Sequence, residues 1–396
     1  MVRLKIAIAG TRGIPARYGG FETFAEELSA RLVERGHEVW VYCRPGNADV
    51  SSAVVERTGR PRSQPHRIVL PALRHKYFET VSHTLLSSID ALPRGFDVVL
   101  LCNAANAFVL PLLRAARIPV AINVDGIERH RRKWNVAGKF VYAIGESFSA
   151  LFANKVVADA DVIADYYRSR YGIEPVTIPY GAEFPVEEDS DVLERLGVEA
   201  NNYILYVSRF EPENNPLEVV TAYLNASSVG CRVSGVGTSE LRLPTPDSRL
   251  PPLIMLGAAS YARDLASTLQ RHASDRILFP GALYGRDYRT LQRNALIYIQ
   301  ATEVGGTHPA MIEAMASGGC VLANDTPENR EVGGEAVGYF RLRPSETLSG
   351  TLREFLASPA LRERMRIAAR VRAGQRYSWS AVTDAYERLF EQIVRH

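Results

Sequence analysis

Short apolar runs alternate along the chain with longer segments in which apolar residues recur at helical spacing. In the first half, the apolar runs predict strands near residues 4–10, 37–43, 67–72, 96–102, 118–124, 155–163 and 175–180. In the second half, they predict strands near residues 203–208, 252–257, 276–280, 295–300, 319–323 and 337–341. Strands that alternate with helices form parallel sheets with helices on both faces, so the pattern predicts an α/β protein.

The alternation is interrupted at residues 182–202, where acidic residues and a proline accumulate. This segment predicts a hinge between two Rossmann-like, doubly wound domains, residues 1–182 and residues 183–375. Residues 376–396 contain a final helix that we expect to pack back on the first domain. Residues 226–252 lack periodicity and are rich in Gly, Ser and Pro, which predicts a surface insertion.

Composition narrows the class of protein. The chain has 396 residues, of which 46% are hydrophobic, and this suits two compact domains of about 150–200 residues each. The net charge of +3 is too small to indicate a nucleic-acid partner. The four cysteines lie far apart, which predicts buried thiols in a reducing cytoplasm. Because the chain enters a strand at once and has no apolar run of about 18 residues, we expect neither a signal peptide nor a membrane span.

The first predicted strand leads directly into the loop GTRGIPARYGG, residues 10–20. Open parallel sheets bind ligands beyond the carboxyl ends of their strands, and the N-terminus of the next helix favours anions. We therefore expect Arg12, Gly13, Gly19 and Gly20 to contact a phosphate or a sugar. The loop lacks the Gly-x-Gly-x-x-Gly spacing and the later acid of a dinucleotide site. A tight turn between strand and helix is the alternative interpretation.

A second flexible loop precedes a helix in QATEVGGTHPAMIEAMASG, residues 300–318. The backbone amides of Gly305 and Gly306, together with Thr307, are placed to face a diphosphate, and His308 is a further candidate contact. Glu313 lies one turn into the predicted helix, where its carboxylate can accept two hydrogen bonds from ribose hydroxyls. Its alternative role is to complement the positive end of the helix dipole.

Two similar α/β domains that carry these clusters resemble the GT-B glycosyltransferases, whose two domains face each other across a cleft. The segment GGTHPAMIEAMASGGCVLAND resembles the signature of glycosyltransferase family 4, in which a Glu, seven residues and a second Glu precede Ala-Met-Ala and a Gly. Glu313 matches the second Glu, whereas Gly305 stands at the position of the first. Glu303 lies two residues too early to match. The resemblance implies a nucleotide-sugar donor.

Four motifs in order resemble bacterial rhamnosyltransferases that assemble cell-wall and capsular polysaccharide. They are GTRGIPARYGGFETFAEEL (10–28), VDGIE (124–128), SRFEPENN (208–215) and VGGTHPAMIEAMA (304–316). In family 4 an Arg, and a Lys five residues after it, usually clamp the donor diphosphate. Arg209 matches the Arg, but Asn214 replaces the Lys, so Arg12 and backbone amides are expected to assist Arg209.

The resemblance implies a retaining transfer of L-rhamnose from deoxythymidine-diphosphate rhamnose, with no metal and no other cofactor. Uridine- and guanosine-diphosphate sugars remain open as donors. Asp125 follows a predicted strand and could orient the acceptor hydroxyl or act as a base, and Glu128 is a second acid candidate. Capping the turn at Gly126 is the alternative role of Asp125. The Asp-x-Asp that begins at Asp159 lies in an apolar run, and we interpret it as polarity at a strand edge rather than a metal site.

The resemblance implies a glycan or a lipid-diphosphate-linked glycan as acceptor. Residues 114–139 contain seven Lys or Arg against two acids, and residues 74–78 read RHKYF. Basic and aromatic segments predict contact with an anionic membrane, with an ordinary solvated surface as the alternative. We expect a cytoplasmic protein associated with the inner face of the membrane. Two other functions remain open, namely a non-catalytic assembly subunit that binds sugar nucleotide and a sugar-nucleotide epimerase on the same fold.

Overall fold

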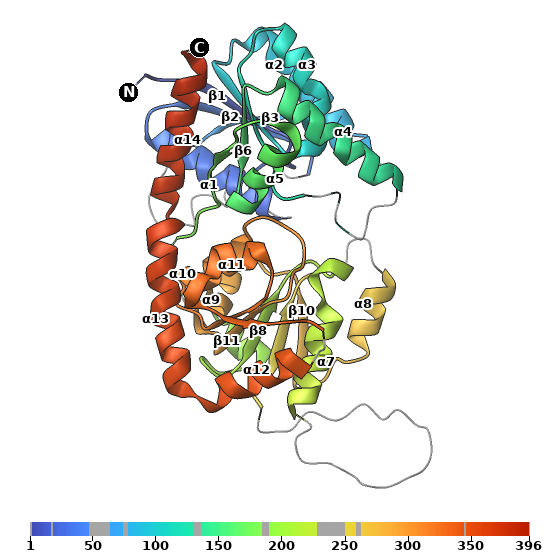
Figure 1. Ribbon diagram of the computed structural model, residues 1–396, viewed down its shortest axis with the longest axis vertical. Coiled ribbons are helices and arrows are strands. Elements are labelled where there is room, and N and C mark those ends of the chain that lie inside the picture. Colours follow the sequence, from blue (N-terminus) through green and yellow to red (C-terminus); the bar gives the residue numbers. More distant parts are fainter. Residues whose placement is uncertain are drawn as a thin grey trace. The chain divides into compact units, whose positions relative to one another are not determined.

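The computed structural model describes residues 2–16, 19–46, 64–73, 78–127, 129, 131, 136–183, 190–227, 250–258, 263–343 and 346–395. Contacts divide the chain into two units (Figure 1). Unit 1 comprises Met1–Ala182, Val304–Pro309 and Tyr377–His396, and unit 2 comprises Glu183–Glu303 and Ala310–Arg376. Most of the predicted insertion lies outside the described residues, as do Glu128 and His130.

Unit 1 contains a seven-stranded sheet in which all neighbouring strands are parallel. Its strands are β1 (Lys5–Ala9), β2 (Glu38–Cys43), β3 (His66–Val69), β4 (Val98–Cys102), β5 (Val120–Asn123), β6 (Lys155–Ala158) and β7 (Val176–Thr177). The order β3-β2-β1-β4-β5-β6-β7 reverses direction beside β1, and ligands bind such sheets at this switch point. The strand predicted at 155–163 is too long, because a helix begins at Asp161.

Helices cover both faces of this sheet. They are α1 (Gly20–Glu34), α2 (Phe78–Ala91), α3 (Leu110–Ala115), α4 (Val136–Phe152), α5 (Asp161–Tyr171) and α14 (Trp379–Val394), with 3₁₀ helices η2 (Leu92–Arg94) and η3 (Ala104–Val109). Parallel crossovers are right-handed, so α1 covers one face, whereas α2 to α5, which lead the other way along the sheet, cover the opposite face. The C-terminal helix α14 packs on α1, which completes the first layer (Figure 1).

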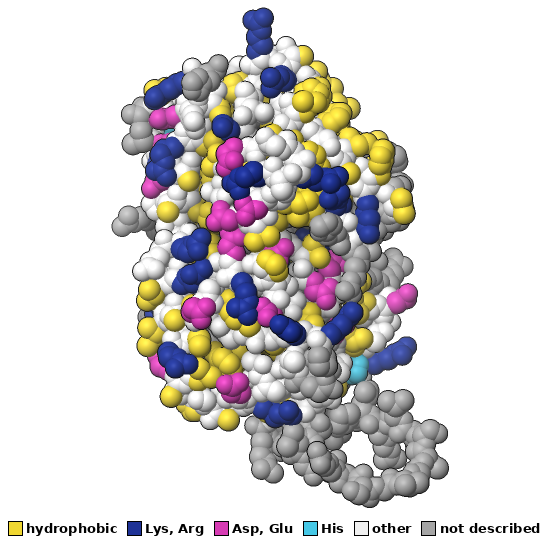
Figure 2. Space-filling view, in the orientation of Figure 1, with side chains coloured by type: hydrophobic (Ala, Val, Ile, Leu, Met, Phe, Trp, Pro, Cys, Tyr) yellow, Lys and Arg dark blue, Asp and Glu magenta, His cyan; other side chains and the backbone are white. Residues whose placement is uncertain are grey.

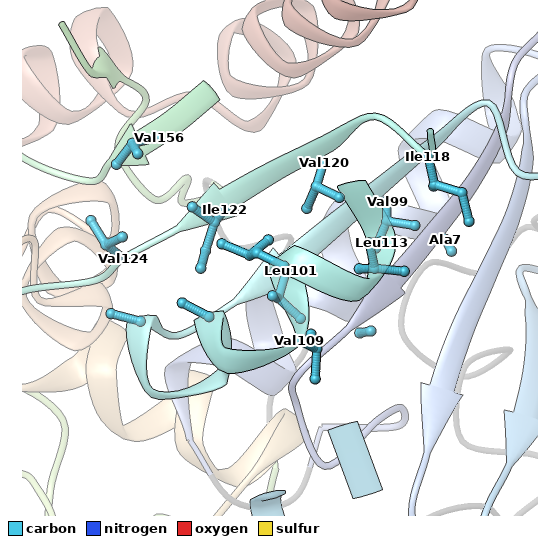
Figure 3. Packing of buried hydrophobic residues seen from close by; sticks show 14 of the residues in the cluster. Ala7, Val99, Leu101, Val109, Leu113, Ile118, Val120, Ile122, Val124 and Val156 are labelled. Carbon is cyan, nitrogen blue, oxygen red and sulfur yellow. The ribbon is translucent and has the colours of Figure 1, made fainter. Parts of the chain in front are cut away.

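A large apolar core lies between this sheet and the layer of α2 to α5. Figure 3 shows Val99, Leu101 and Ile122 on the strands beside Val109 and Leu113 of η3 and α3. None of these five side chains is more than 2% exposed. Strands buried on both faces read as continuous apolar runs, which is why the sequence pattern located them. Burial contributes about 1.5–3 kcal/mol for each such side chain, so the loops that follow these strands start from a rigid base.

Unit 2 contains a second parallel sheet, of six strands in the order β10-β9-β8-β11-β12-β13. The strands are β8 (Ile204–Val207), β9 (Leu253–Leu256), β10 (Ile277–Gly281), β11 (Ile297–Gln300), β12 (Val321–Asn324) and β13 (Gly338–Phe340). The helices are α6 (Val192–Leu196), α7 (Pro216–Ser227), α8 (Arg263–Gln270), α9 (Gly285–Asn294), α10 (Pro309–Ala316), α11 (Pro327–Gly333), α12 (Glu346–Ala357) and α13 (Pro359–Arg376), with η5 (Pro212–Asn214) and η6 (Gly334–Ala336). Two Rossmann-like parallel sheets confirm the predicted α/β fold class.

A buried ionic cluster holds α14 to the rest of unit 1. Glu387 accepts a hydrogen bond from Arg35 Nη1 at 2.7 Å, and its other oxygen lies 2.9 Å from His37 Nε2. His37 Nδ1 accepts the Leu4 N–H at 3.1 Å, so the ring proton lies on Nε2 and points to Glu387. Burial opposes the ionisation of Glu387, but the hydrogen bonds from His37 and Arg35 outweigh burial and lower its pKa. The last helix is therefore fixed to the segments that flank β1 and β2.

Replacing Glu387 by Gln is expected to destabilise the protein by about 1–3 kcal/mol at neutral pH, because Arg35 loses its charged partner. The lowered pKa means that this stabilisation is complete above pH 4.5, the unperturbed value, and disappears as the pH falls through the folded-state pKa. Urea unfolding as a function of pH measures both effects. Glu391→Gln, which removes the more exposed pair with Arg395, is the matched control and is expected to change little.

Candidate functional site

The loop after β1 is held by two glycines that no other residue could replace without strain. Gly10 and Gly13 have φ of +90° and +98°. A Cβ at Gly10 would lie 2.4 Å from the Cys102 carbonyl oxygen, and one at Gly13 would lie 2.5 Å from Cys43. Because these two positions lack a side chain, the loop can lie between the ends of β2 and β4. Gly13 thus has a structural role in addition to the ligand contact predicted for it.

Two buried carboxylates of α1 fasten the same loop. Glu22 accepts the Arg12 N–H at 2.9 Å, and Glu26 accepts the Ala16 N–H at 3.2 Å. Burial raises the pKa of Glu22. The Arg12 guanidinium lies 3.9 Å from Glu79, and Arg44 lies 3.3 Å from the same carboxylate. The side chain of Arg12 thus belongs to an ionic cluster at the carboxyl ends of β1 and β2, inside unit 1.

Gly19 and Gly20 begin α1. Gly19 is extended, with φ of −170°, and a Cβ there would come no closer than 3.5 Å to another group. A Cβ at Gly20 would lie 3.2 Å from Pro309, at the end of the segment Val304–Pro309. Gly20 is therefore close to the second glycine loop, as a shared site requires.

Asp125 lies two residues beyond β5 in a left-handed conformation, with φ of +31°. Its N–H donates to Asn123 Oδ1 at 3.2 Å, and Asn123 Nδ2 donates to the Tyr386 hydroxyl oxygen at 2.9 Å. Tyr386 is a fully buried residue of α14. Non-glycine residues at positive φ are uncommon and cluster at functional sites, since the surrounding structure must hold them. The C-terminal helix therefore positions Asp125 through Asn123.

Asp159 forms a carboxyl pair with Asp125. The two carboxyl groups are close enough for the charge of Asp125 to act on Asp159. Asp159 is fully buried, and its Oδ2 accepts the Thr307 N–H at 2.6 Å and lies 3.1 Å from Thr307 Oγ1. Burial and the charge of Asp125 raise the pKa of Asp159 well above its usual range, although the hydrogen bonds from Thr307 act in the opposite direction. Asp159 thus links the end of β6 to the loop that contains Thr307, a role that differs from the strand-edge polarity predicted for it.

The glycines of the second loop allow this contact. A Cβ at Gly306 would lie 2.0 Å from Asp159 Oδ1, and a Cβ at Gly305 would lie 2.4 Å from the His308 ring. A Cβ at Gly126 would lie 3.1 Å from the carbonyl carbon of Gly305 and 3.1 Å from the backbone nitrogen of Gly306. Gly305, which stands where family 4 has its first Glu, is therefore enclosed by His308. The segment Val304–Pro309 can lie against Asp159 because Gly306 lacks a side chain.

Replacing Gly306 by Ala is expected to destabilise unit 1 by about 1–3 kcal/mol, because the new methyl group overlaps a fully buried carboxylate. Chemical denaturation measures the loss. The double variant Gly306→Ala/Asp159→Ala should recover part of it, since the carboxylate is then absent. Gly350→Ala is the control, because a Cβ at that position in α12 meets nothing within 4 Å and alanine favours a helix. Equal effects of the two single substitutions would contradict the packing.

His308 is partly buried at the start of α10. Burial, and to a smaller extent the nearby Arg131 charge, lower the pKa of His308 to about 4. The imidazole is therefore neutral at pH 7 and offers a ligand one donor and one acceptor rather than a positive charge. This state suits a hydrogen bond to a phosphate or a sugar hydroxyl.

In unit 2, Glu313 lies in the second turn of α10, and the Tyr288 hydroxyl of α9 donates to Glu313 Oε2. Gln292 Nε2 donates to the Tyr288 oxygen at 2.8 Å and to the Ala310 carbonyl at 3.2 Å. Burial and the Glu313 charge raise the pKa of Tyr288 well above its usual range, so its hydroxyl stays protonated. These contacts orient the carboxylate as a hydrogen-bond acceptor.

Arg209 lies beyond β8 in unit 2, and its guanidinium is 3.7 Å from Glu211. Asn214 Nδ2 donates to the Arg209 carbonyl at 2.7 Å, and Asn215 Nδ2 donates to the Ala301 carbonyl at 2.9 Å. Asn214, at the position where family 4 has a Lys, therefore shapes the backbone that carries Arg209. The positive charge of the missing Lys is not replaced at this position.

Among the described residues, no group of three or more His, Cys, Asp or Glu side chains is placed to hold a metal ion. Asp159 and Asp161 of the Asp-x-Asp have different environments, since Asp159 is buried against Thr307 and Asp161 opens α5.

Both sheets thus carry polar loops at the carboxyl ends of their central strands, as nucleotide-sugar enzymes with two Rossmann-like domains do. Family models agree with this class. Residues 18–183 match Glycosyltransferase Family 4, and residues 193–372 match Glycosyl transferases group 1. The chain is a glycosyltransferase with the GT-B fold. The two models match successive regions of the chain, and each covers less than half of it.

Solved structures share this fold. Sucrose-phosphate synthase from Thermosynechococcus elongatus has a TM-score of 0.77 and 17% identity, with 99% of each chain covered. HepE from Anabaena, in complex with UDP-glucose, has a TM-score of 0.74 and 15% identity, with 98% of this chain and 100% of HepE covered. An α,α-trehalose-phosphate synthase (UDP-forming) from Burkholderia vietnamiensis has a TM-score of 0.71 and 12% identity, with 100% and 98% covered. Comparison with curated protein sequences gave no match.

Three residues of these sites escaped the sequence interpretation. Tyr288 orients Glu313, and Tyr386 orients Asn123. Asp159 contacts both Thr307 and Asp125. Each contacts a residue that is distant in the sequence. In the sequence alone, the two tyrosines cannot be distinguished from the other tyrosines, many of which lie in the core. A carboxylate inside the apolar run VVADADVIA was the one available signal, because a buried acid needs a partner.

Proposed function

We propose that the chain is a retaining glycosyltransferase that moves L-rhamnose from deoxythymidine-diphosphate rhamnose, without a metal ion. The proposed acceptor is a glycan or a lipid-diphosphate-linked glycan in the synthesis of a bacterial surface polysaccharide. The observation that carries the donor site is the carboxylate of Glu313, oriented by Tyr288 and Gln292, because a ribose diol needs such an acceptor. The choice of rhamnose and of the thymine base is supported by the four motifs that resemble rhamnosyltransferases.

In the proposed reaction, the bond between the anomeric carbon and the diphosphate oxygen breaks, and the acceptor hydroxyl oxygen bonds to the same face of that carbon. The hydroxyl proton passes to the departing diphosphate, so the products are the glycosylated acceptor and a nucleoside diphosphate. Arg209, Arg12, His308 and the amides of the loop Val304–Pro309 are proposed to stabilise the leaving diphosphate. Gly19 and Gly20 are proposed to approach the sugar.

Asp125 is proposed to orient the acceptor hydroxyl. Its carboxyl group interacts with that of Asp159, and its backbone N–H donates to Asn123. A carboxyl group that is held in this way is better suited to positioning the acceptor hydroxyl than to acting as a freely titrating base. Glu128 remains a second acid candidate, three residues further along the chain.

The test is a transfer assay that follows both release of nucleoside diphosphate and formation of product. Purified protein is supplied with dTDP-rhamnose, UDP-glucose or GDP-mannose, each with and without a metal chelator, and with a lipid-diphosphate-linked glycan. Turnover of dTDP-rhamnose that is insensitive to the chelator, with the anomeric configuration kept by NMR, supports the proposal. Preference for UDP-glucose, the ligand named in the HepE structure, would overturn the proposed base and sugar. Conversion of the donor without acceptor would indicate an epimerase, and binding without turnover would indicate an assembly subunit.

The proposed acceptor implies that the enzyme acts in the cytoplasm, at the inner face of the membrane. The described part of the chain contains no helix long and apolar enough to cross a bilayer. The sequence segments RHKYF at residues 74–78 and RHRRKW at 129–134 are basic and aromatic, which supports attraction to anionic lipid.

A further inference from the structure

Asp159 is an acid in the interior of unit 1. Asp and Glu side chains usually lie at the surface of a protein, where Figure 2 shows them among Lys and Arg. Asp159, by contrast, is 0% exposed, and it follows β6 directly. A buried acid is costly unless it makes hydrogen bonds, so the partners of Asp159 indicate its role.

Both hydrogen-bond donors of Thr307 are engaged by one oxygen of Asp159. The Thr307 backbone N–H donates to Asp159 Oδ2 at 2.6 Å, and the Thr307 hydroxyl donates to the same oxygen at 3.1 Å. Thr307 is itself only 3% exposed, so these bonds are shielded from water. A diphosphate would have to compete with Asp159 for both donors of Thr307.

The two amides that precede Thr307 are not engaged in this way. Gly305 and Gly306 are buried, and within the described part of the chain their backbone N–H groups have no hydrogen-bond acceptor. Most buried N–H groups in folded proteins are paired, and unpaired ones are rare. Successive unpaired N–H groups can bind an anion, which supplies the missing acceptor. These two amides, rather than that of Thr307, are therefore suited to bind the donor diphosphate.

Two close approaches fix where this loop lies in unit 1. A Cβ at Gly306 would lie 2.0 Å from Asp159 Oδ1, so the backbone comes closer to the carboxyl group than a residue with a side chain would permit. A Cβ at Gly126 would lie 3.1 Å from the carbonyl carbon of Gly305 and 3.1 Å from the nitrogen of Gly306. The loop therefore lies between the residue that follows Asp125 and the carboxyl group of Asp159.

Asp159 also has a rigid base. The strands β5 and β6 are parallel neighbours, and beyond β5 the Val124 N–H donates to the Val157 carbonyl at 3.0 Å. Val157 is fully buried. Asp125 and Asp159 therefore leave adjacent strands at the same edge of the sheet. The bonds from Thr307 to Asp159 hold the loop beside Asp125, the residue proposed to orient the acceptor.

The charge state of Asp159 suits a place close to an anion. Burial, and next the charge of Asp125, raise the pKa of Asp159 well above its usual range. A raised pKa favours the neutral acid, which does not repel a diphosphate as a carboxylate would. An Asn side chain has nearly the same shape and is always neutral, so Asn should be able to replace Asp159 in this role.

We propose that Asp159 is a positioning residue of the donor site. It binds both donors of Thr307 and thereby fixes the loop, so that the unpaired N–H groups of Gly305 and Gly306 are kept for the donor diphosphate. Thr307 acts through Asp159 and does not itself bind the donor. A loop that is fixed before the donor arrives loses less conformational entropy on binding. The inference rests on the proposed function, because it assigns how a loop of the same site is held.

The experiment measures the affinity of the full chain for dTDP, UDP and GDP by isothermal titration. For the diphosphate that the wild-type protein binds best, Asp159→Ala is expected to weaken binding about tenfold, because the loop loses two hydrogen bonds and its fixed position. Asp159→Asn is expected to bind within about twofold of wild type, since its amide oxygen can accept the Thr307 N–H. Glu146→Ala is the matched control. It removes another buried carboxylate of unit 1, which accepts from Tyr166 at 2.7 Å and Tyr171 at 3.0 Å, and it should lower stability without weakening binding.

Thr307→Val tests whether Thr307 acts through Asp159. The substitution removes the hydroxyl and keeps the backbone N–H, and it is expected to weaken binding about two- to fivefold. In the Asp159→Ala background, the same substitution should have no further effect, because the hydroxyl has lost its partner. Hydrogen exchange of a peptide that contains residues 304–309 gives a readout without ligand. Exchange is expected to be faster in Asp159→Ala than in wild type and unchanged in Glu146→Ala.

Several results would overturn the inference. One is wild-type affinity in folded Asp159→Ala, and another is tighter binding, which would show that Asp159 competes with the donor for Thr307. Additive effects of Asp159→Ala and Thr307→Val would show that Thr307 binds the donor itself. Unchanged binding by Thr307→Val would overturn the inference even if Asp159→Ala failed to fold. Absence of binding of any of the three diphosphates to the wild-type protein would instead overturn the proposed function, and the inference with it.

Discussion

Replacing Asp125 by Ala is expected to lower kcat about a hundredfold or more, with the KM for the donor changed little. The carboxyl group is held by Asn123 and Asp159 in a backbone conformation with positive φ, and such strain persists only where the surroundings enforce it. All of these constraints lie within unit 1, whereas Glu313 lies in unit 2. The loss should therefore fall on kcat and on the KM of the acceptor. Steady-state kinetics with each substrate varied in turn measures the division.

Asp159 provides the control for this prediction. In Asp159→Asn, the amide oxygen can still accept the Thr307 N–H and the amide nitrogen can donate to Asp125, so this variant imitates the protonated pair. We expect it to fold and to keep most of its kcat. Asp159→Ala leaves the Thr307 N–H without its buried acceptor, and we expect it to lose about 1–3 kcal/mol of stability. Equal kcat for Asp125→Ala and the wild type, in a folded protein, would remove Asp125 from the reaction.

The carboxyl pair also predicts a pH dependence. Because the pKa of Asp159 is raised in the folded protein, the folded state binds this proton more tightly than the unfolded state does. Its stabilising effect is complete below pH 3.8, the unperturbed value, and is lost as the pH rises through the folded-state pKa. The free energy of unfolding of Asp159→Asn should lack this decline. Comparing urea unfolding of wild type and variant across that range measures this decline, and parallel pH profiles would contradict the raised pKa of Asp159.

The sequence was sufficient to predict the fold because the central strands of both sheets, such as β4, β5, β11 and β12, are buried along their whole length. Each strand of the described residues overlaps a predicted strand, because runs of Val, Ile and Leu are typical of strands in a parallel sheet. The strand predicted at 155–163 failed beyond Ala158 because Asp159 and Asp161 interrupt the run, although apolar residues surround them. Apolar content alone could not distinguish the end of β6 from the start of α5.

Only those parts of the candidate sites that belong to local sequence motifs could be predicted. The glycines and Glu313 belong to motifs in which spacing carries the information. The partners of Asp125 do not, because Asn123 reaches Tyr386 across 263 positions and Asp159 reaches Thr307 across 148. The sequence also suggested that residues 304–309 belong with the second domain, whereas this segment packs with unit 1 because Gly306 admits Asp159. Such contacts join segments that are far apart in the chain, so no local pattern in the sequence predicts them.

Replacing Glu313 by Ala is expected to weaken donor binding about 30- to 100-fold, because two hydroxyl hydrogen bonds to a carboxylate are lost. Tyr288→Phe should weaken binding about three- to tenfold, since the carboxylate remains but its orienting hydroxyl is removed. Isothermal titration with the nucleoside diphosphates of thymine, uracil and guanine measures both effects and identifies the base. Glu335→Gln changes an exposed carboxylate of unit 2 and is the control. A smaller loss for Glu313→Ala than for Tyr288→Phe would show that Tyr288 itself contacts the ligand. Unchanged affinity in Glu313→Ala would mean that α10 does not bind the ribose, and the proposed donor site would be wrong.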